Sequence, residues 1–407
     1  MNSKLLSDEI QSYIREHEHV DAKKLLLKYR SIQGIPASTI AQQIIGRQKA
    51  KEKLPLFYET HNIIYPPGIN LEQSSSEATA QYKKDFIFEG IESPGCIADL
   101  TGGLGVDSYF FDQIFSKVFF IEPDVELLEI VKHNHRQLGA KNITYFPSTA
   151  EAFLEQFHQP LDCFYIDPSR RREGNRKVFS FADCAPDVTS LQPRLFQLTR
   201  FVVVKASPLL DIKQGISDLQ FVKRVVVLSV QNECKELLFV CERDHWGEPL
   251  IQAVNVLKGK NPQLVQFRHS DEREAIVTYS EPLSYLYEPN ASLLKAGAFK
   301  IISDRYNLLK LHPNTHLYTS DTLVRDFPGN TFRVIAQPKA SKKVVNEFFS
   351  EGKAIVTTRN YPLSVSELRK KTGLKEGGEK YLIGCSSQSK KHLIVAEKII
   401  IEKPGPD

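Results

Sequence analysis

A short apolar run that ends in an acid and then breaks into glycines is the feature that most constrains this fold. Residues 96–107 read CIADLTGGLGVD, with a strand pattern up to Asp99, glycines at 102, 103 and 105, and a helical pattern after them. This order predicts a strand, a tight turn and a helix start. Glycine in such a turn lets the backbone lie against a bound ligand.

Two further apolar runs also end in an acid. KVFFIEPD reaches Glu122, 23 residues after Asp99, and LDCFYIDPSRRREG reaches Asp167 before an arginine-rich loop. A carboxylate at Glu122 suits a ribose diol, because it can accept two hydrogen bonds from the hydroxyl groups. Since parallel strands end at one edge of a sheet, the three acids predict a single pocket.

Predicted strands and helices alternate from residue 91 to residue 244. This alternation is typical of a parallel sheet covered on both faces, as in Rossmann-like α/β folds. The last two strand patterns, RVVVLSV and ELLFVCE, have only a few residues between them. So short a gap favours a hairpin, and hence one antiparallel strand at the end of the sheet.

The rest of the chain divides into flanking segments, because 407 residues exceed the size that one core normally serves. Helical periodicity predicts a small helical domain over 1–70, before the α/β domain over 71–246. The pattern weakens over 247–330. Over 331–407 the predicted order is strand, helix, strand, helix, strand, strand, with the first helix over 341–352, which suits a two-layer α+β module.

The composition excludes several classes of protein. The hydrophobic share is 41% and the charged share 25%, which is ordinary for a soluble globular chain. The apolar runs are of strand length, and the first residues lack a signal-peptide pattern, so no membrane partner is expected. Six cysteines without a CxxC pair favour a reducing, cytoplasmic location, and the histidines show no metal-ligand spacing, so no metal is predicted.

The net charge of +4 is unevenly distributed along the chain. Residues 331–407 carry 15 Lys+Arg against 8 Asp+Glu, a balance of +7, which leaves −3 on the first 330 residues. The basic tail indicates a polyanionic partner.

The glycine-rich turn leaves three interpretations open: a dinucleotide site, a purely structural turn, or a site for S-adenosylmethionine (SAM). Here the acid precedes the glycines, which suits the ammonium and ribose of SAM better than a pyrophosphate. DLTGGLGVD resembles motif I of the class I SAM-dependent methyltransferases, and Glu122 matches the acid that binds the SAM ribose in that family. The resemblance implies a cofactor site made of Asp99, Thr101, Gly102, Gly103, Gly105, Asp107, Glu122, Pro123, Thr149 and Asp167. For Thr149, a helix N-cap is an equally good account.

The loop after the third acid carries the most distinctive chemistry. Asp167, Pro168 and Ser169 occupy the place of the (D/N)PP(Y/F/W) motif with which amino-methylating enzymes of this class hold a base, and Arg170 replaces the aromatic residue. The loop is also similar to the DPPR of 5-methyluridine RNA methyltransferases. Those enzymes need a cysteine nucleophile, and the matching segment VKASP has none. We expect Asp167–Ser169 to position the nucleophilic atom.

Basic residues surround this predicted pocket. Arg170, Arg171 and Arg172 are interpreted as a phosphate clamp, because one guanidinium group can donate two hydrogen bonds to the oxygens of one phosphate. The alternative is a solvated loop. Lys205, at the end of the strand FVVVKA, could hold Asp167 by an ion pair or act as a proton acceptor with a lowered pKa.

Nearly the whole chain resembles the bacterial class I methyltransferases that have a C-terminal THUMP-like domain. The residues that carry this resemblance are GRQKAKEKLP, EQSSSEATAQYK, DLTGGLGVDS, IDPSRRREG, KASPLLDI and YEPNASLLKAGAF. The resemblance implies a SAM-dependent catalytic domain, a ferredoxin-like module, a THUMP-like tail and a base of structured RNA (tRNA or rRNA) as substrate. The alternatives are a methyltransferase of proteins or small molecules, and a non-catalytic RNA-binding protein that retains the fold.

Overall fold

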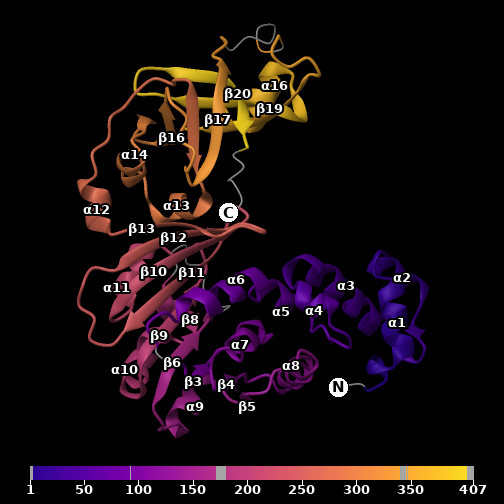
Figure 1. Cartoon of the computed structure of the whole chain (residues 1–407). Helices are drawn as coiled ribbons and strands as arrows, with labels where there is room; N and C mark the ends of the chain where they lie inside the picture. The colour runs from indigo at the N-terminus through magenta and orange to yellow at the C-terminus, as the bar shows by residue number, and fades with distance from the viewer. Residues whose placement is uncertain (1–2, 92, 171–179, 340–344, 346, 401–407) are drawn as a thin grey trace, which may run out of the picture. The chain divides into compact units, whose positions relative to one another are not determined.

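The computed structural model describes residues 3–91, 93–170, 180–339, 345 and 347–400. They fall into two compact units, whose elements are labelled in Figure 1. The first unit comprises Met1–Val225 and Lys235–Gly247, and the second comprises Val226–Cys234 and Glu248–Asp407. Among the described residues, no helix combines the length and apolarity that crossing a membrane requires.

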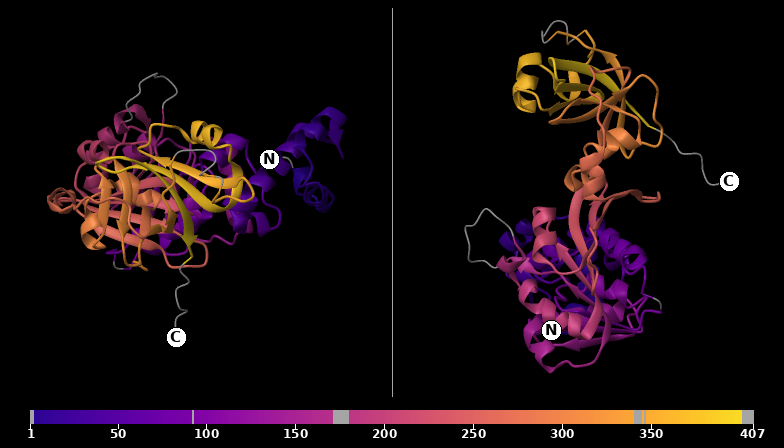
Figure 2. Two further views of the ribbon diagram at one scale, coloured as in Figure 1. Left: turned by 90° about the horizontal axis from the view of Figure 1, so that it is seen from above. Right: turned by 90° about the vertical axis from the view of Figure 1, so that its left-hand side faces the viewer.

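The first unit begins with helices, as the periodicity predicts. They are η1 (Ser3–Leu6), α1 (Asp8–Glu16), α2 (Ala22–Lys28), α3 (Ala37–Lys53), α4 (Pro55–Glu59), α5 (Gly68–Gln73), α6 (Glu77–Tyr82) and the π-helical turn η2 (Lys83–Ile87), with the short strands β1 (Ser31–Ile32) and β2 (Ile35–Pro36) between α2 and α3. Figure 1 and the left view of Figure 2 show α1 and α2 at one end of this unit.

These helices are not a separate body. Ile40 and Ile44 of α3 belong to an apolar cluster made almost entirely by the N-terminal helices. A second cluster joins Leu54 and Phe57 to Phe110 of α7 (Val106–Phe111), which follows the glycine-rich turn. Apolar burial therefore attaches the helical segment to the α/β part of the unit.

The sheet of the first unit has the predicted mainly parallel architecture. Up to β10, the strands of this nine-stranded sheet run in the order β5-β4-β3-β6-β9-β11-β10. Pairing is parallel from β5 to β9, and β11 pairs antiparallel with β9. The strands are β3 (Cys96–Asp99), β4 (Lys117–Ile121), β5 (Ile143–Phe146), β6 (Leu161–Ile166), β9 (Thr199–Ala206), β10 (Val222–Val230) and β11 (Glu233–Glu242).

Helices connect the parallel strands of this sheet. They are α7, α8 (Val125–Gln137), α9 (Ala150–Gln156), α10 (Val188–Leu198) and α11 (Ile212–Asp218), and the β6–α10 connection also holds β7 (Ser169–Arg170), η3 (Phe181–Asp183) and β8 (Cys184–Ala185). Helical crossovers return each parallel strand in the same direction, so the carboxyl ends gather at one edge of the sheet.

The expected position of the antiparallel strand is wrong. The hairpin exists, with Gln231 and Asn232 both at positive φ in its two-residue turn. However, β11 lies between β9 and β10 and not at the end of the sheet. The crossover through α11 sets β10 one strand spacing away from β9, and the hairpin returns β11 into that space.

The second unit is mainly antiparallel, with β18 and β19 as a parallel pair. After β12 (Leu250–Val256) and β13 (Gln263–Phe267), a seven-stranded sheet has the order β15-β16-β14-β17-β20-β19-β18. Its strands are β14 (Tyr285–Pro289), β15 (Leu309–His312), β16 (Thr315–Ser320), β17 (Gly329–Ala336), β18 (Lys353–Arg359), β19 (Lys375–Ser386) and β20 (Lys391–Ile399). The helices are α12 (His269–Glu274), α13 (Ala291–Ala296), α14 (Ile301–Arg305) and α16 (Val365–Thr372), labelled in Figure 1.

One sheet spans both segments that the sequence divides at residue 330. Strand β14 pairs with β16 on one side and with β17 on the other. The predicted order of strands and helices after residue 331 agrees with β17, β18, α16, β19 and β20. The helix expected over 341–352 lies largely outside the described residues.

Candidate functional site

The ends of the parallel strands bring the predicted acids to one edge. Asp99 pairs with Phe120 of β4 and with Tyr165 of β6, one residue before each of those strands ends. Glu122 follows β4 directly and Asp167 follows β6 directly. In the neighbouring pair of strands, Ile166 lies opposite Val204, which precedes Lys205.

The three glycines of the turn have different roles. A Cβ on Gly102 would lie 2.3 Å from the Phe120 ring, and one on Gly105 would lie 2.6 Å from the His135 imidazole. Those two positions are glycine because the packing around them leaves no room. Gly103 has φ +53°, and a Cβ there would meet only the Thr101 carbonyl oxygen, at 3.8 Å. The backbone at Gly103 is therefore the open part of the turn.

Glu122 is held beside this open backbone. Its Oε2 accepts a hydrogen bond from the Gly103 amide at 2.9 Å, and its Oε1 accepts one from the Asp124 amide at 2.9 Å. Burial raises the pKa of Glu122, and the two amide hydrogen bonds oppose that change. Each carboxylate oxygen keeps acceptor capacity for one hydroxyl group of a ligand.

Asp99 lies deeper, with 2% of its surface exposed. Its Oδ2 accepts from the Ser108 hydroxyl at 2.6 Å, and its Oδ1 accepts from the Thr101 amide at 3.1 Å. These bonds connect the end of β3 to the turn and to α7. Contact of Asp99 with a cofactor, which the sequence predicts, stays a prediction.

The loop after β6 is fastened to the same turn. The Asp167 amide donates to the Thr101 hydroxyl at 2.6 Å. Pro168 is half-buried, and Ser169 is exposed in β7, where it pairs with Ala185. Thr101 thus links the first strand end to the segment that the sequence assigns to nucleophile positioning.

A buried polar cluster lies behind this edge and unites predicted and unpredicted residues. It consists of Ser75, Lys83, Asp107, Tyr165, Asp167, Lys205 and Glu236. Lys205 Nζ lies 2.5 Å from Asp167 Oδ2 and 4.0 Å from Glu236 Oε2. Lys83 Nζ lies 2.7 Å from Glu236 Oε1 and 3.0 Å from Asp107 Oδ1.

Ser75 connects the two lysines. Its hydroxyl donates to Asp107 Oδ2 at 2.7 Å and accepts from Lys83 and Lys205 at 3.0 and 3.1 Å. The Tyr165 hydroxyl donates to the same Asp107 oxygen at 2.8 Å. A segment that precedes β3 therefore binds both the helix after the glycine turn and the strand that holds Asp167.

The carboxylates of the cluster favour the charged form of Lys205. Burial by itself would lower the pKa of Lys205, but the carboxylates of Asp167, Glu236 and Asp107 outweigh it, and the pKa is raised. Of the two interpretations of Lys205, the contact with Asp167 and the raised pKa both favour the ion pair over the proton acceptor.

A proposed methyltransferase from Porphyromonas gingivalis W83, solved as a crystal structure, is 31% identical to this chain, with a TM-score of 0.84, over 98% of this chain and 99% of its own. The chain belongs to the THUMP-like methyltransferase family. A ferredoxin-like domain model matches residues 285–328, and a THUMP domain-like model matches residues 329–398.

Other solved structures resemble only part of this family member. A proposed methyltransferase from Streptococcus mutans, in complex with SAH, is 13% identical and covers 40% of this chain and 96% of its own, with a TM-score of 0.31. An rRNA methylase from Streptococcus thermophilus is 14% identical and covers 40% of this chain and 94% of its own, with a TM-score of 0.30. No curated protein matches the chain.

Among the remaining predicted site residues, Thr149 follows β5 and Pro123 follows β4, and their contact with a cofactor stays a prediction. Thr149 caps α9 by accepting from the Ala152 amide at 3.2 Å, and Pro123 is exposed directly after Glu122. The predicted phosphate clamp is outside what the structure describes: Arg171 and Arg172 are not among the described residues, and of Arg170 only the backbone is. Within the described part of the chain, no group of metal-ligating side chains is found.

Four residues of the cluster are absent from the predicted site: Ser75, Lys83, Tyr165 and Glu236. Ser75 lies in the family-specific QSSSE string, so the sequence marks this segment, but it does not indicate which residues Ser75 contacts. Lys83 and Glu236 are charged residues next to or within otherwise buried segments, with side chains 0% and 4% exposed. A charge placed in an apolar pattern is the sequence signal of a buried ion pair.

The buried carboxyl of Asp99 gives a pH-dependent prediction. Burial raises the pKa of Asp99 to about 7, and nearby Asp107 acts in the same direction. The folded protein therefore retains a proton that the unfolded chain releases near pH 4, so this group lowers the free energy of unfolding as the pH rises toward 7. We expect the free energy of unfolding of Asp99→Asn, minus that of the wild type, to rise by about 2–3 kcal/mol from pH 5 to pH 8.

Urea unfolding of both proteins at the two pH values measures this difference. Every other titrating group is present in both proteins, so its contribution cancels in the difference between them. If the free energy of unfolding changed equally in the two proteins between pH 5 and pH 8, Asp99 would be ionised throughout this range.

Proposed function

We propose that this chain is a SAM-dependent methyltransferase that modifies a base in structured RNA. The observation that carries the proposal is the Glu122 carboxylate, fixed by two backbone amides beside the open backbone of Gly103. Membership of a methyltransferase family supports the class of reaction.

The residues at this edge fit SAM. Glu122 offers acceptors for both ribose hydroxyls, and a cofactor can lie against Gly103 without meeting a side chain. The buried cluster contains three carboxylates, those of Asp107, Asp167 and Glu236, and the ammonium groups of Lys83 and Lys205. This excess of one negative charge is complementary to a sulfonium cation.

Asp167 is the residue of this site that we assign to the methyl acceptor. When bound, SAM supplies an electrophilic methyl group, and the chain needs mainly to align a lone pair with it. One oxygen of Asp167 binds Lys205, and the side chain is 32% exposed, so the other oxygen can accept an N–H group of a base. The direct bond from the Asp167 amide to Thr101 fixes this acceptor relative to the glycine turn.

RNA is the proposed substrate because of the C-terminal segment. Residues 329–398 match a THUMP domain-like model, and residues 331–407 have a charge balance of +7. Lys370 and Lys371, in the last turn of α16, and Lys375, at the start of β19, are all exposed. Exposed lysines of this kind bind phosphate groups, and they make the affinity for nucleic acid fall as the salt concentration rises.

Glu122→Ala should weaken SAM binding by about 10- to 100-fold, because two charge-assisted hydrogen bonds to the ribose are lost. Calorimetry with SAM measures the effect, and Glu126→Ala is the matched control, since Glu126 is an exposed glutamate in the first turn of α8. Equal affinity of Glu122→Ala and wild type would place the cofactor elsewhere.

Transfer of labelled methyl groups from SAM tests the substrate. RNA, protein and small-molecule fractions of cells that lack the protein are each incubated with the wild-type enzyme, and any modified nucleoside is identified by mass spectrometry. Labelled RNA supports the proposal. Label in protein or small molecules but not in RNA would overturn the RNA assignment, and SAM binding without any transfer would favour a non-catalytic protein.

A further inference from the structure

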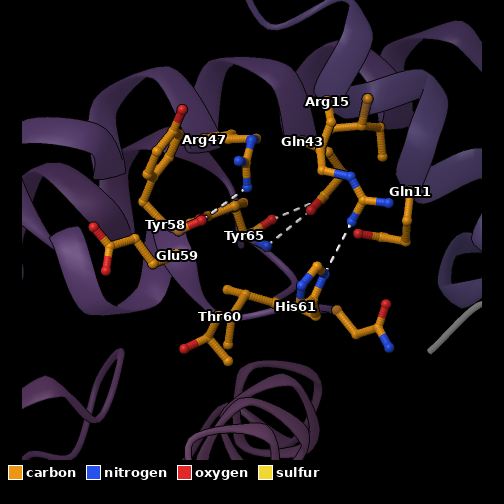
Figure 3. Close-up of a pocket in the computed structure, with 12 residues that line it drawn as sticks. Gln11, Arg15, Gln43, Arg47, Tyr58, Glu59, Thr60, His61 and Tyr65 are labelled. Atoms are coloured by element: carbon orange, nitrogen blue, oxygen red, sulfur yellow. Dashed lines mark hydrogen bonds between the residues drawn. The ribbon is translucent and has the colours of Figure 1, made fainter.

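A cavity outside the candidate cofactor site lies among the N-terminal helices of the first unit (Figure 3). Its volume is about 240 Å³, and it is lined by Gln11, Ile14, Arg15, Gln43, Arg47, Tyr58, Glu59, Thr60, His61, Asn62, Ile63 and Tyr65. The cavity is built on a firm frame, because Gln43 exchanges two hydrogen bonds with the backbone of Tyr65, at 2.9 and 2.8 Å.

This cavity is distinct from the candidate cofactor site. None of the residues that line it belongs to the glycine turn, the strand ends or the buried cluster. Sites for whole cofactors or drug-sized ligands usually occupy about 300–1,000 Å³. A cavity of about 240 Å³ suits a smaller group, such as a phosphate with its attached sugar.

Arg15 gives the cavity an uncompensated positive charge. Within the described part of the chain its guanidinium has no carboxylate partner, and its hydrogen bonds go to neutral groups: His61 Nδ1 at 3.3 Å and Ser12 Oγ at 3.2 Å. Because Arg15 can only donate, His61 Nδ1 is the acceptor, and the proton of the neutral ring is on Nε2. Arg15 and His61 can therefore both donate to an anion.

A second guanidinium lines the cavity on the α3 side. Arg47 pairs with Glu18 through Nε at 2.6 Å, donates from Nη1 to the Tyr58 carbonyl oxygen at 2.9 Å, and lies 4.1 Å from the centre of the Tyr58 ring. Its Nη2 makes no hydrogen bond to any residue that the structure describes. Glu59, the acid among the lining residues, is exposed, and Figure 3 shows its carboxylate directed away from Arg15 and His61.

We propose that this cavity binds a phosphate group together with its attached sugar, and that in the functional complex this group belongs to the backbone of RNA. Guanidinium forks match phosphate oxygens, and an imidazole N–H adds a third donor. The RNA part of the inference rests on the proposed function, whereas the phosphate part rests on the cavity alone.

Arg15→Gln tests the proposal, with Arg30→Gln as the matched control, because Arg30 is exposed and does not line the cavity. Ribose 5-phosphate, at about ten times its dissociation constant, should raise the melting temperature of the wild type and Arg30→Gln by about 3 °C at constant ionic strength, and leave Arg15→Gln unchanged. His61→Ala, at an exposed position, repeats the test should Arg15→Gln fail to fold.

Binding of total RNA is the second measurement. The dissociation constant of Arg15→Gln should rise about 5- to 10-fold, and the slope of log affinity against log salt should fall by about 1. Stabilisation by ribose 5-phosphate with unchanged RNA affinity would mean that the cavity takes a free sugar phosphate, which overturns the RNA assignment. No response to either ligand overturns the site, whereas a wild type that binds ribose 5-phosphate but no RNA contradicts the proposed function and leaves the cavity assigned to phosphate.

Discussion

Lys83→Met is expected to lower the free energy of unfolding of the first unit by about 3–5 kcal/mol. The Lys83 side chain is 0% exposed, and its ammonium lies between the carboxylates of Glu236 and Asp107. Methionine fills a similar volume but leaves both carboxylates buried without this partner. The loss therefore comes from uncompensated charge and not from a cavity.

The charge balance of the cluster explains why the effect is large. In the wild type, the ammonium of Lys83, with that of Lys205, lowers the pKa of Asp107 although burial raises it. With Lys83 removed, the three carboxylates have one ammonium group among them, that of Lys205. The folded state must then hold an excess of two negative charges or take up a proton, and both reduce stability at neutral pH.

A double variant separates this mechanism from simple loss of packing. Lys83→Met with Glu236→Gln removes one charge of each sign, so the original balance is restored. We expect the double variant to be more stable than Lys83→Met alone, as a double-mutant cycle in urea measures. Far-ultraviolet circular dichroism follows the unfolding transition of each variant. A double variant at or below the stability of Lys83→Met would exclude the charge explanation.

Asp167→Ala is expected to reduce methyl transfer to RNA by about 100-fold or more, with a much smaller loss of SAM affinity from the one negative charge removed. The reason is that Asp167 holds the acceptor base, and loss of alignment by about 1 Å is enough for an effect of this size. The fold should survive, because the side chain is partly exposed and its removal leaves two carboxylates facing the two lysines. Rates of labelled methyl transfer and calorimetry with SAM measure the two effects separately.

Glu155→Ala serves as the control for this variant, since Glu155 is an exposed acid on α9 in the same unit. Retention of most of the activity in Asp167→Ala would show that the acceptor base is held by other residues. A parallel fall in SAM affinity would instead place Asp167 in the cofactor site, which is the second role that the sequence predicts for it.

The edge of the sheet could be predicted from the sequence because it depends on local patterns. Asp99, Glu122 and Asp167 each close an apolar strand, and parallel pairing of β3, β4 and β6 brings such positions together. The glycine turn was equally readable. The position of β11 was not, because a short hairpin gap gives the direction of a strand but not its neighbours.

The sequence by itself determined the α/β class, the strand-end acids and the family resemblance, since each rests on residues close together in the chain. Only the tertiary structure decided how Ser75, Lys83 and Glu236 join Asp107, Asp167 and Lys205, with Glu236 lying 153 positions after Lys83. Periodicity carries no information on contacts at that separation. What selects them is the free energy of burying charge, which requires each buried lysine to find carboxylates wherever the fold brings them.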